Sequence, residues 1–432
     1  GHILTVNGSN VNTRRYWEVY YNLDFNHTDH YFEHELRSRL DDSVRIHLRS
    51  DVPVGAYLSG GLDSSTVASA GSRVSENDFM AFTGKFSEGP EYDESHYAQL
   101  LADECDIDLK IINITASDFL ENIRKVIYHL DYPVAGPGSF PQYMVSQLAA
   151  KHRKVVLGGQ GGDEIFGGYT RYLIAYFEQC IKSAIEGSMH SGNFIVTYES
   201  IIPNLTSLHS YIPLLKQFWS KGLFEDMDRR YFYLINRAPQ LKNEIKWDNL
   251  GEYSPFRSFQ ELFHSSNVLK ESYFDLMTHF DFKTLLPALL QVEDRVSMAH
   301  GLESRVPLLD HPLVELAATV PSNIKFEDGT MKHIFKKVVR PYLPRKILER
   351  KDKMGFPTPL NTWVKGEAKE FVHDLFSTSN AQNREFVDNK VVADNLGEEM
   401  KFGRKLWGLM CLEMWHQEFV DGHSRFKQMM HS

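Results

Sequence analysis

Residues 59–65 combine glycines, serines and one acid in a pattern suited to binding an oxyanion. The segment reads Ser59-Gly60-Gly61-Leu62-Asp63-Ser64-Ser65. Glycines let the backbone approach a phosphate closely, and the free N–H groups and dipole of a helix N-terminus favour negative charge. The carboxylate of Asp63 would repel a phosphate unless a divalent cation lies between them. We therefore predict a phosphate site that includes a metal ion; the alternative is a turn that merely caps a helix.

The flanking residues predict the elements that would position this loop. An apolar run at Val52–Leu58 predicts a buried strand, and residues 64–74 predict the helix that follows it. The same alternation continues with strands at Phe79–Phe86, Leu109–Ile114 and Lys154–Leu157 and with helices at 93–104, 118–130 and 139–152, after a first amphipathic helix at 31–50. This order predicts an α/β fold with a parallel, doubly wound sheet, in which ligands bind beyond the carboxyl ends of the strands.

A second glycine-rich segment follows the predicted strand Lys154–Leu157. Six of the eleven residues at 158–168 are glycine, and Asp163 and Glu164 lie among them. Together with Asp63, Asp163 could hold Mg²⁺ on a triphosphate, because magnesium usually takes one or two protein carboxylates plus phosphate oxygens and water. A solvated acidic turn is the alternative, and two such loops at the ends of strands of one sheet make it weaker.

These loops resemble those of the ATP pyrophosphatases, and the pair is similar to the synthetase domain of the asparagine synthetases and their β-lactam synthetase relatives. The segments Glu293–Asp310 and Arg350–Pro359 share two further motifs with that family. The resemblance extends from about residue 16 to about residue 365. It implies the adenine nucleotide alpha-hydrolase type of α/β fold and a large helical C-terminal part.

The resemblance also implies a division of the chain. Residues 1–25 would be the remnant of an interdomain junction, and residues 26–170 would form the ATP-pyrophosphatase core. The chain becomes helical from about residue 171, with helical spacing at 172–186 and 268–300. Residues 171–432 would complete the active site through the two motifs at 293–310 and 350–359. Residues 187–215 carry no clear pattern.

Individual roles follow from the matched motifs. ATP and its departing pyrophosphate would contact Leu58, Ser59, Gly60, Gly61, Leu62, Asp63, Ser64, Ser65, Gly158, Gly159, Gln160 and Gly161. Mg²⁺ would lie between Asp63 and Asp163. Lys353 would stabilise the charge that develops on the α-phosphate, with Lys351 as the rival lysine. Glu303 and Arg305 would serve the acceptor site, or would form a structural ion pair.

The resemblance implies an ATP-dependent amide synthetase. The side-chain carboxylate of aspartate would attack the α-phosphorus of MgATP, pyrophosphate would leave, and ammonia would displace AMP to give asparagine. Complete members of the family draw ammonia from glutamine through a glutaminase domain with an N-terminal cysteine, whereas this chain begins Gly1-His2. We therefore expect the glutaminase domain upstream or on a separate chain, and the use of free ammonia by this one. The resemblance also allows a homodimer.

Two other functions remain open. A related amide- or lactam-forming ligase would use the same chemistry on a different acceptor. Gln160 is compatible with this different ligase. Some relatives have a glutamate or a tyrosine at this position, whereas the amide of Gln160 cannot act as a base. A nucleotide-binding module without catalysis is the second alternative, against which Asp63, Asp163 and Lys353 argue.

The composition is compatible with a soluble enzyme. The 432 residues are 42% hydrophobic and 24% charged, which is ordinary for globular proteins. The net charge of −10 argues against a nucleic-acid partner, and the absence of an apolar run of about 18 residues argues against a membrane span. Three scattered cysteines form neither a metal pattern nor a disulfide framework, so we expect a reducing, cytoplasmic location.

Overall fold

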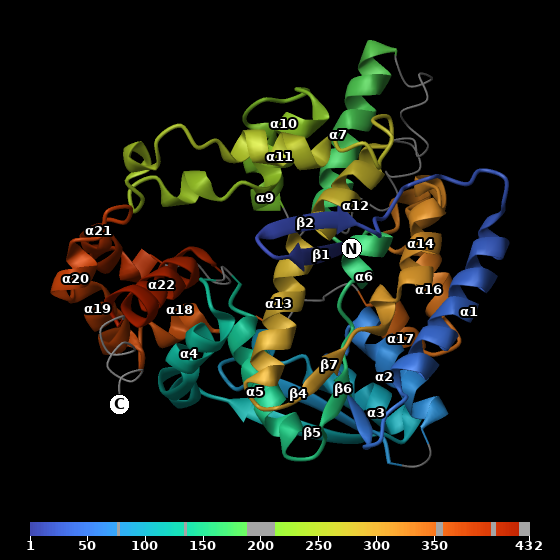
Figure 1. The fold of residues 1–432 in the computed structure, drawn as a ribbon, viewed down its shortest axis with the longest axis horizontal. Helices are drawn as coiled ribbons and strands as arrows, with labels where there is room; N and C mark the ends of the chain where they lie inside the picture. Colours follow the sequence, from blue (N-terminus) through green and yellow to red (C-terminus); the bar gives the residue numbers. More distant parts are fainter. Residues whose placement is uncertain (76–77, 134–135, 188–211, 351–356, 399–402, 423–432) are drawn as a thin grey trace.

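A parallel sheet, drawn in the lower part of Figure 1, carries both glycine-rich loops. The structure, a computed structural model, describes residues 1–75, 78–133, 136–187, 212–350, 357–398 and 403–422. The strand order is β5 (Asp108–Ile114), β4 (Met80–Phe86), β3 (Val54–Tyr57), β6 (Val155–Leu157) and β7 (Glu303–Arg305), and all neighbours are parallel. This confirms the predicted α/β class and its four predicted strands.

The fifth strand, β7, was not predicted. Its three residues are Glu303, Ser304 and Arg305, so it has no apolar run that would mark a strand. It forms because it pairs with β6, with Val155 opposite Glu303 and Leu157 opposite Arg305. Glu303 and Arg305 therefore lie on a sheet edge.

Helices pack on both faces of the sheet, as expected for a doubly wound fold. Ala81 of β4 is buried on the face covered by α2 (Leu62–Val74) and α3 (Ser95–Cys105). The next residue, Phe82, points to the opposite face and packs against Val145 and Ala149 of α5 (Ser139–Ala150). Alternate strand residues thus build two separate hydrophobic layers.

Local sequence signals explain two of the helices that flank the sheet. In α1 (Asp29–His47) the buried residues Phe32, Leu36, Leu40 and Val44 recur every four positions, which places them on one face. The helix α4 (Ala116–Leu130) begins with a capping box, in which the Thr115 hydroxyl accepts from the Asp118 N–H and the Asp118 carboxylate accepts from the Thr115 N–H. Both helices confirm the sequence prediction within a few residues.

The described residues of the rest of the chain are mainly helical, as predicted. Its helices are α6 (Gly162–Phe166), α7 (Thr170–Glu186), α9 (Ile212–Trp219), α10 (Met227–Ile235), α11 (Pro255–Phe263), α12 (Tyr273–Lys283), α13 (Leu285–Met298), α14 (His311–Thr319), α15 (Ser322–Lys325), α16 (His333–Val339), α17 (Arg345–Leu348), α18 (Leu360–Trp363), α19 (Lys369–Ser377), α20 (Ser379–Gln382), α21 (Asn389–Asp394) and α22 (Lys405–Trp415). The continuous helical spacing predicted at 268–300 is divided into α12 and α13, because Thr284 leaves the helical conformation.

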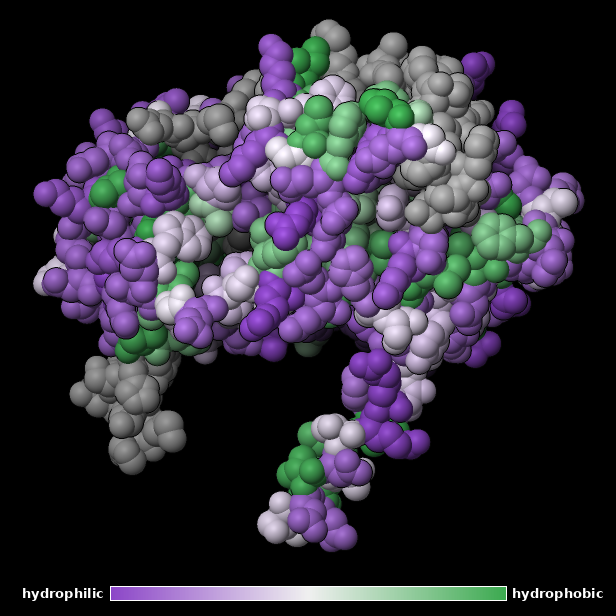
Figure 2. All heavy atoms as spheres, turned by 90° about the horizontal axis from the view of Figure 1, so that it is seen from above, coloured by the Kyte–Doolittle hydropathy of each residue, from purple (hydrophilic) through white to green (hydrophobic). Residues whose placement is uncertain are grey.

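The first residues form an exposed hairpin. Strands β1 (His2–Asn7) and β2 (Asn10–Arg15) pair antiparallel, and Gly8 turns between them with a φ of +60°. All twelve strand residues are exposed, and the hairpin projects from the body of the molecule (Figure 2). The division of the chain into a junction, a core and a helical part stays a prediction. Within the described ranges, no helix combines the length and apolar character needed to cross a bilayer.

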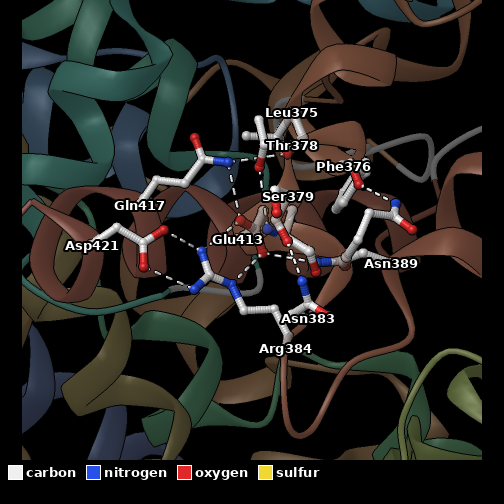
Figure 3. Close-up of polar contacts among 12 residues, drawn as sticks. Leu375, Phe376, Thr378, Ser379, Asn383, Arg384, Asn389, Glu413, Gln417 and Asp421 are labelled. Atoms are coloured by element: carbon white, nitrogen blue, oxygen red, sulfur yellow. Dashed lines mark hydrogen bonds and ion pairs between the residues drawn. The ribbon is translucent and has the colours of Figure 1, made fainter.

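The C-terminal helices are joined by a charged network around Arg384 (Figure 3). Its guanidinium donates to both carboxylate oxygens of Glu413, at 2.8 and 3.0 Å, and to both of Asp421, at 2.7 and 3.0 Å. Glu413 is buried in α22 and also accepts from Asn389 of α21 at 2.8 Å. Hydrogen bonds to Asp421 and Glu413 raise the pKa of Arg384, so the guanidinium stays charged.

Replacing Arg384 with methionine is expected to lower the free energy of unfolding by about 2–3 kcal/mol, somewhat less than for a fully buried pair, since Asp421 is partly exposed. The loss arises because Glu413 remains buried without its cation. Urea unfolding of the purified chain measures it. Arg345→Met, at an arginine whose side chain is 86% exposed, is the matched control. Equal unfolding midpoints for the two variants would contradict this expectation.

Candidate active site

The loop at residues 59–65 follows the carboxyl end of β3, and its last four residues form the first turn of α2, so the predicted order of strand, glycine-rich turn and helix is confirmed. Its hydroxyls bond within the loop: the Oγ atoms of Ser59 and Ser64 are 2.9 Å apart, and Ser64 Oγ donates to the Gly61 carbonyl at 3.3 Å. Gly60 has a φ of +72°, and a Cβ there would lie 2.4 Å from the Cβ of Tyr97. The backbone shape thus requires glycine at this position.

The second glycine-rich loop lies directly against the first. A Cβ on Gly159 would be 2.6 Å from the backbone nitrogen of Ser64, and a Cβ on Gly162 would be 2.3 Å from Asp63 Oδ1. These glycines therefore allow two loops from neighbouring strands to pack together. The structure brings Asp63 and Asp163 to the same place, as the sequence analysis predicted.

A lysine that the sequence analysis missed joins the two acids. The Nζ atom of Lys332 lies 2.7 Å from each carboxylate oxygen of Asp63 and 2.6 Å from Asp163 Oδ1. Lys332 is 5% exposed and Asp63 is 7% exposed, so this contact is nearly shielded from water. Gly168 makes room for the lysine, because a Cβ there would lie 2.2 Å from its Cε.

The arrangement fits the predicted magnesium ion. Two carboxylates from different loops converge on one position, and in this structure that position is held by a cation, the Lys332 ammonium. Magnesium prefers oxygen ligands and takes one or two carboxylates from the protein. Asp63 and Asp163 are the residues that would hold it.

Glu293 of α13 lies under the start of the second loop and was quoted in a motif without a predicted role. A Cβ on Gly158 would be 2.0 Å from its Oε1. Its carboxylate accepts from Ser304 Oγ at 2.6 Å, from Gln142 Nε2 at 3.2 Å and from the side chain of Gln160. Burial raises the pKa of Glu293, and these hydrogen bonds act in the opposite direction. The unusual Gln160 is therefore held by a buried acid.

Gly158→Ala is expected to displace Glu293 and to lower the free energy of unfolding by about 1–3 kcal/mol, as overpacking usually does. The turnover rate should fall as well, because Gln160 loses the acid that orients it. Thermal unfolding and initial rates check the two effects. Gly366→Ala is the control, because a Cβ at Gly366 meets no atom closer than 3.5 Å. An alanine variant at Gly158 that matches this control in both measurements would contradict the packing argument.

The second acid of the loop, Glu164, has a different environment from Asp163. It is buried, and the Tyr169 hydroxyl donates to its Oε1 at 2.5 Å. Burial, followed by the charge of Asp163, raises the pKa of Glu164 to about 7. The Arg171 guanidinium covers the Tyr169 ring at 3.9 Å and pairs with Asp281 at 2.5 Å. Glu164 and Tyr169 therefore anchor the end of the loop to α7 and α12.

The structure does not bring Glu303 and Arg305 into the contact between Asp63, Asp163 and Lys332. They pair with each other at 2.7 Å, and Arg305 also donates to the main-chain carbonyls of His47 and Arg49 at 2.7 and 2.8 Å. These contacts favour the structural ion pair, and a role at the acceptor site stays a prediction. Lys353 and Lys351 lie outside the described residues, so their predicted roles stay predictions too.

Comparison with known proteins indicates the family in which such a site occurs. A family model described as asparagine synthase matches residues 35–417. The chain is 29% identical over 416 residues to the glutamine-hydrolyzing asparagine synthetase 1 of Bacillus subtilis, with 92% of this chain and 61% of that protein covered. It is 42% identical over 241 residues to the putative glutamine-hydrolyzing asparagine synthetase 2 of Methanocaldococcus jannaschii, covering 54% of this chain and 46% of that protein.

The relatives are not all named for the same reaction. Amidase chry2 of Gibberella zeae is 25% identical over 398 residues, with 83% of this chain and 57% of that protein covered. Most of this chain aligns with the Bacillus subtilis and Gibberella zeae proteins. The aligned part covers about three-fifths of the length of each of those two proteins.

Proposed function

Because this chain belongs to the asparagine synthase family, we propose that it is an ATP-dependent amide synthetase that adenylates a carboxylic acid and passes the acyl group to ammonia or an amine. The observation that carries the proposal is the convergence of Asp63 and Asp163 on one cation position between two glycine-rich loops. Both loops lie at the carboxyl ends of adjacent parallel strands, which is where nucleotides bind in such sheets.

Different residues of the site would bind the departing pyrophosphate and the α-phosphate. The N–H groups and hydroxyls of residues 59–65 would bind the departing pyrophosphate at the N-terminus of α2. Asp63 and Asp163 would hold Mg²⁺, which when bound neutralises charge on the phosphate oxygens. Lys332 would then donate to phosphate oxygens in place of the carboxylates. Lys353 would stabilise the charge on the α-phosphate, as the family resemblance implies.

Aspartate is the acid that we propose first, with ammonia as the nitrogen source. Its support is that several relatives are named asparagine synthetases. A glutaminase partner remains part of this proposal, because those relatives are named glutamine-hydrolyzing.

An amide ligase with another acceptor is the second candidate, and the pair Gln160–Glu293 favours it. The Gln160 amide cannot take a proton from an attacking amine. Through its hydrogen bond, Glu293 would orient the Gln160 amide, which would bind the acceptor and would not act as a base. Relatives named amidases show that other reactions are assigned within this similarity range.

Pyrophosphate release distinguishes these candidates. The purified chain receives MgATP and ammonium with aspartate, with other amino and carboxylic acids, or with no acid as the control. Release that depends on aspartate and produces asparagine in equal amount supports the first proposal. Release that depends on another acid supports the second candidate. Nucleotide binding without release under any condition would contradict both and would indicate a non-catalytic module.

A further inference from the structure

Arg350 connects three distant parts of the chain at the first glycine-rich loop. It follows α17, and its side chain is 4% exposed. Nη1 donates to the main-chain carbonyl of Gly60 at 3.1 Å, Nη2 pairs with Glu94, and the guanidinium lies 3.9 Å from the centre of the Tyr97 ring. Glu94 and Tyr97 stand at the start of α3. A buried cation thus touches the backbone of the loop that we expect to bind phosphate.

The contact with Gly60 fixes the direction of one peptide unit. In a trans peptide the carbonyl of one residue and the N–H of the next point in opposite directions. With the Gly60 carbonyl directed at Arg350, the Gly61 N–H is directed away from Arg350 and toward Ser59, whose Oγ accepts from it at 3.3 Å. Gly61 is the N-cap of α2, so this N–H extends the set of donors at the helix N-terminus.

Glycines alone do not hold that orientation. Gly60 has a φ of +72°, and glycine populates positive and negative φ with similar ease, so this peptide unit can rotate at little cost. A rotated unit would present the Gly60 carbonyl oxygen to the phosphate and would repel it. The guanidinium opposes the rotation because its rigid fork binds a carbonyl and a carboxylate at once.

We propose that Arg350 is a positioning residue that fixes the Gly60–Gly61 peptide, so that the loop presents N–H groups to pyrophosphate. Glu94 and Tyr97 hold the guanidinium in place. The inference rests on the proposed function, and Arg350 itself need not touch the reacting atoms.

Binding of two ligands by isothermal titration calorimetry tests this role. Magnesium pyrophosphate probes the loop, and adenosine probes the remainder of the nucleotide site. We expect Arg350→Gln to weaken pyrophosphate binding by about 10- to 100-fold, the range for a hydrogen bond that involves a charged group. Adenosine binding should stay at the wild-type value, because adenosine carries no phosphate. Arg350→Lys should recover part of the affinity, since an ammonium can reach the carbonyl but lacks the fork.

Two further variants keep the test decisive. Glu94→Gln keeps Arg350 but removes the carboxylate that pairs with it. We expect this variant to lose about threefold to tenfold in pyrophosphate affinity, less than Arg350→Gln. It allows the role to be tested even if Arg350→Gln fails to fold. Arg345→Gln is the matched control, because the exposed Arg345 side chain pairs with Glu349 one helical turn away, and this variant should bind both ligands normally.

The outcomes that overturn the inference are distinct. Folded Arg350→Gln and Glu94→Gln variants with wild-type pyrophosphate affinity would refute it. Equal losses of pyrophosphate and adenosine affinity would also refute it, since they would indicate general damage to the fold. Wild-type protein that binds no magnesium pyrophosphate would overturn the proposed function together with this inference.

Discussion

Asp63→Asn is expected to reduce kcat for pyrophosphate release by about 10²- to 10³-fold, the range for removing one electrostatic contact to the transition state. The amide keeps the shape of the side chain but carries no charge to hold Mg²⁺ or to pair with Lys332. The magnesium concentration needed for half-maximal rate should rise. Initial rates over a series of MgCl₂ concentrations measure both effects.

A matched control separates the site from general charge effects. Asp42→Asn removes a carboxylate from an exposed pair with Arg45 on α1 and should leave the rate and its magnesium dependence unchanged. Asp163→Asn should behave like Asp63→Asn, since both acids contact the same cation position. An Asp63→Asn enzyme with the magnesium dependence of the wild type would show that these acids are not the metal ligands.

Lys332→Met is expected to lower the free energy of unfolding of the metal-free protein by about 2–3 kcal/mol, less than for a fully buried pair, because it leaves the buried carboxylate of Asp63 and the partly exposed carboxylate of Asp163 together without a cation. Added Mg²⁺ with ATP should restore much of this stability, since the ion would take the position of the ammonium. The wild type should gain less, because its own cation already holds that position. Turnover should fall even with saturating metal, since a phosphate donor is lost.

Thermal unfolding with and without MgATP measures this exchange. Lys337→Met is the control, because Lys337 pairs with Asp29 and Glu327 on the surface and touches neither loop. Lys332→Met should show a lower midpoint than the control without metal and a larger increase with MgATP. If both variants unfold at the same temperature in both conditions, Lys332 does not substitute for the metal.

The parts of the site that could be predicted are those encoded within short stretches of sequence. Each glycine-rich loop directly follows an apolar run, so its place at a strand end and the meeting of Asp63 with Asp163 follow from the topology of a parallel sheet. The helix α1 was predictable because its apolar residues recur every four positions.

The contacts that were missed depend on folding over long distances. Lys332 lies 269 residues from Asp63, outside each quoted motif, and only the burial of Asp63 beside a second acid, Asp163, reveals the need for its ammonium. Glu293 was visible in a motif, but its contact with Gly158 and Gln160 depends on α13 packing beneath the loop. Strand β7 depends on pairing with β6, because its own three residues carry no strand pattern.

Product analysis with labelled ATP tests the central claim most directly. The purified chain is incubated with Mg²⁺, aspartate, ammonium and ATP labelled at the α- or the γ-phosphate, and the nucleotide products are separated. If residues 59–65 bind a leaving pyrophosphate, the α label appears in AMP and the γ label in pyrophosphate, in amounts equal to the amide formed. Appearance of the labels in ADP and inorganic phosphate would contradict the account, because the loop would then bind a transferable γ-phosphate.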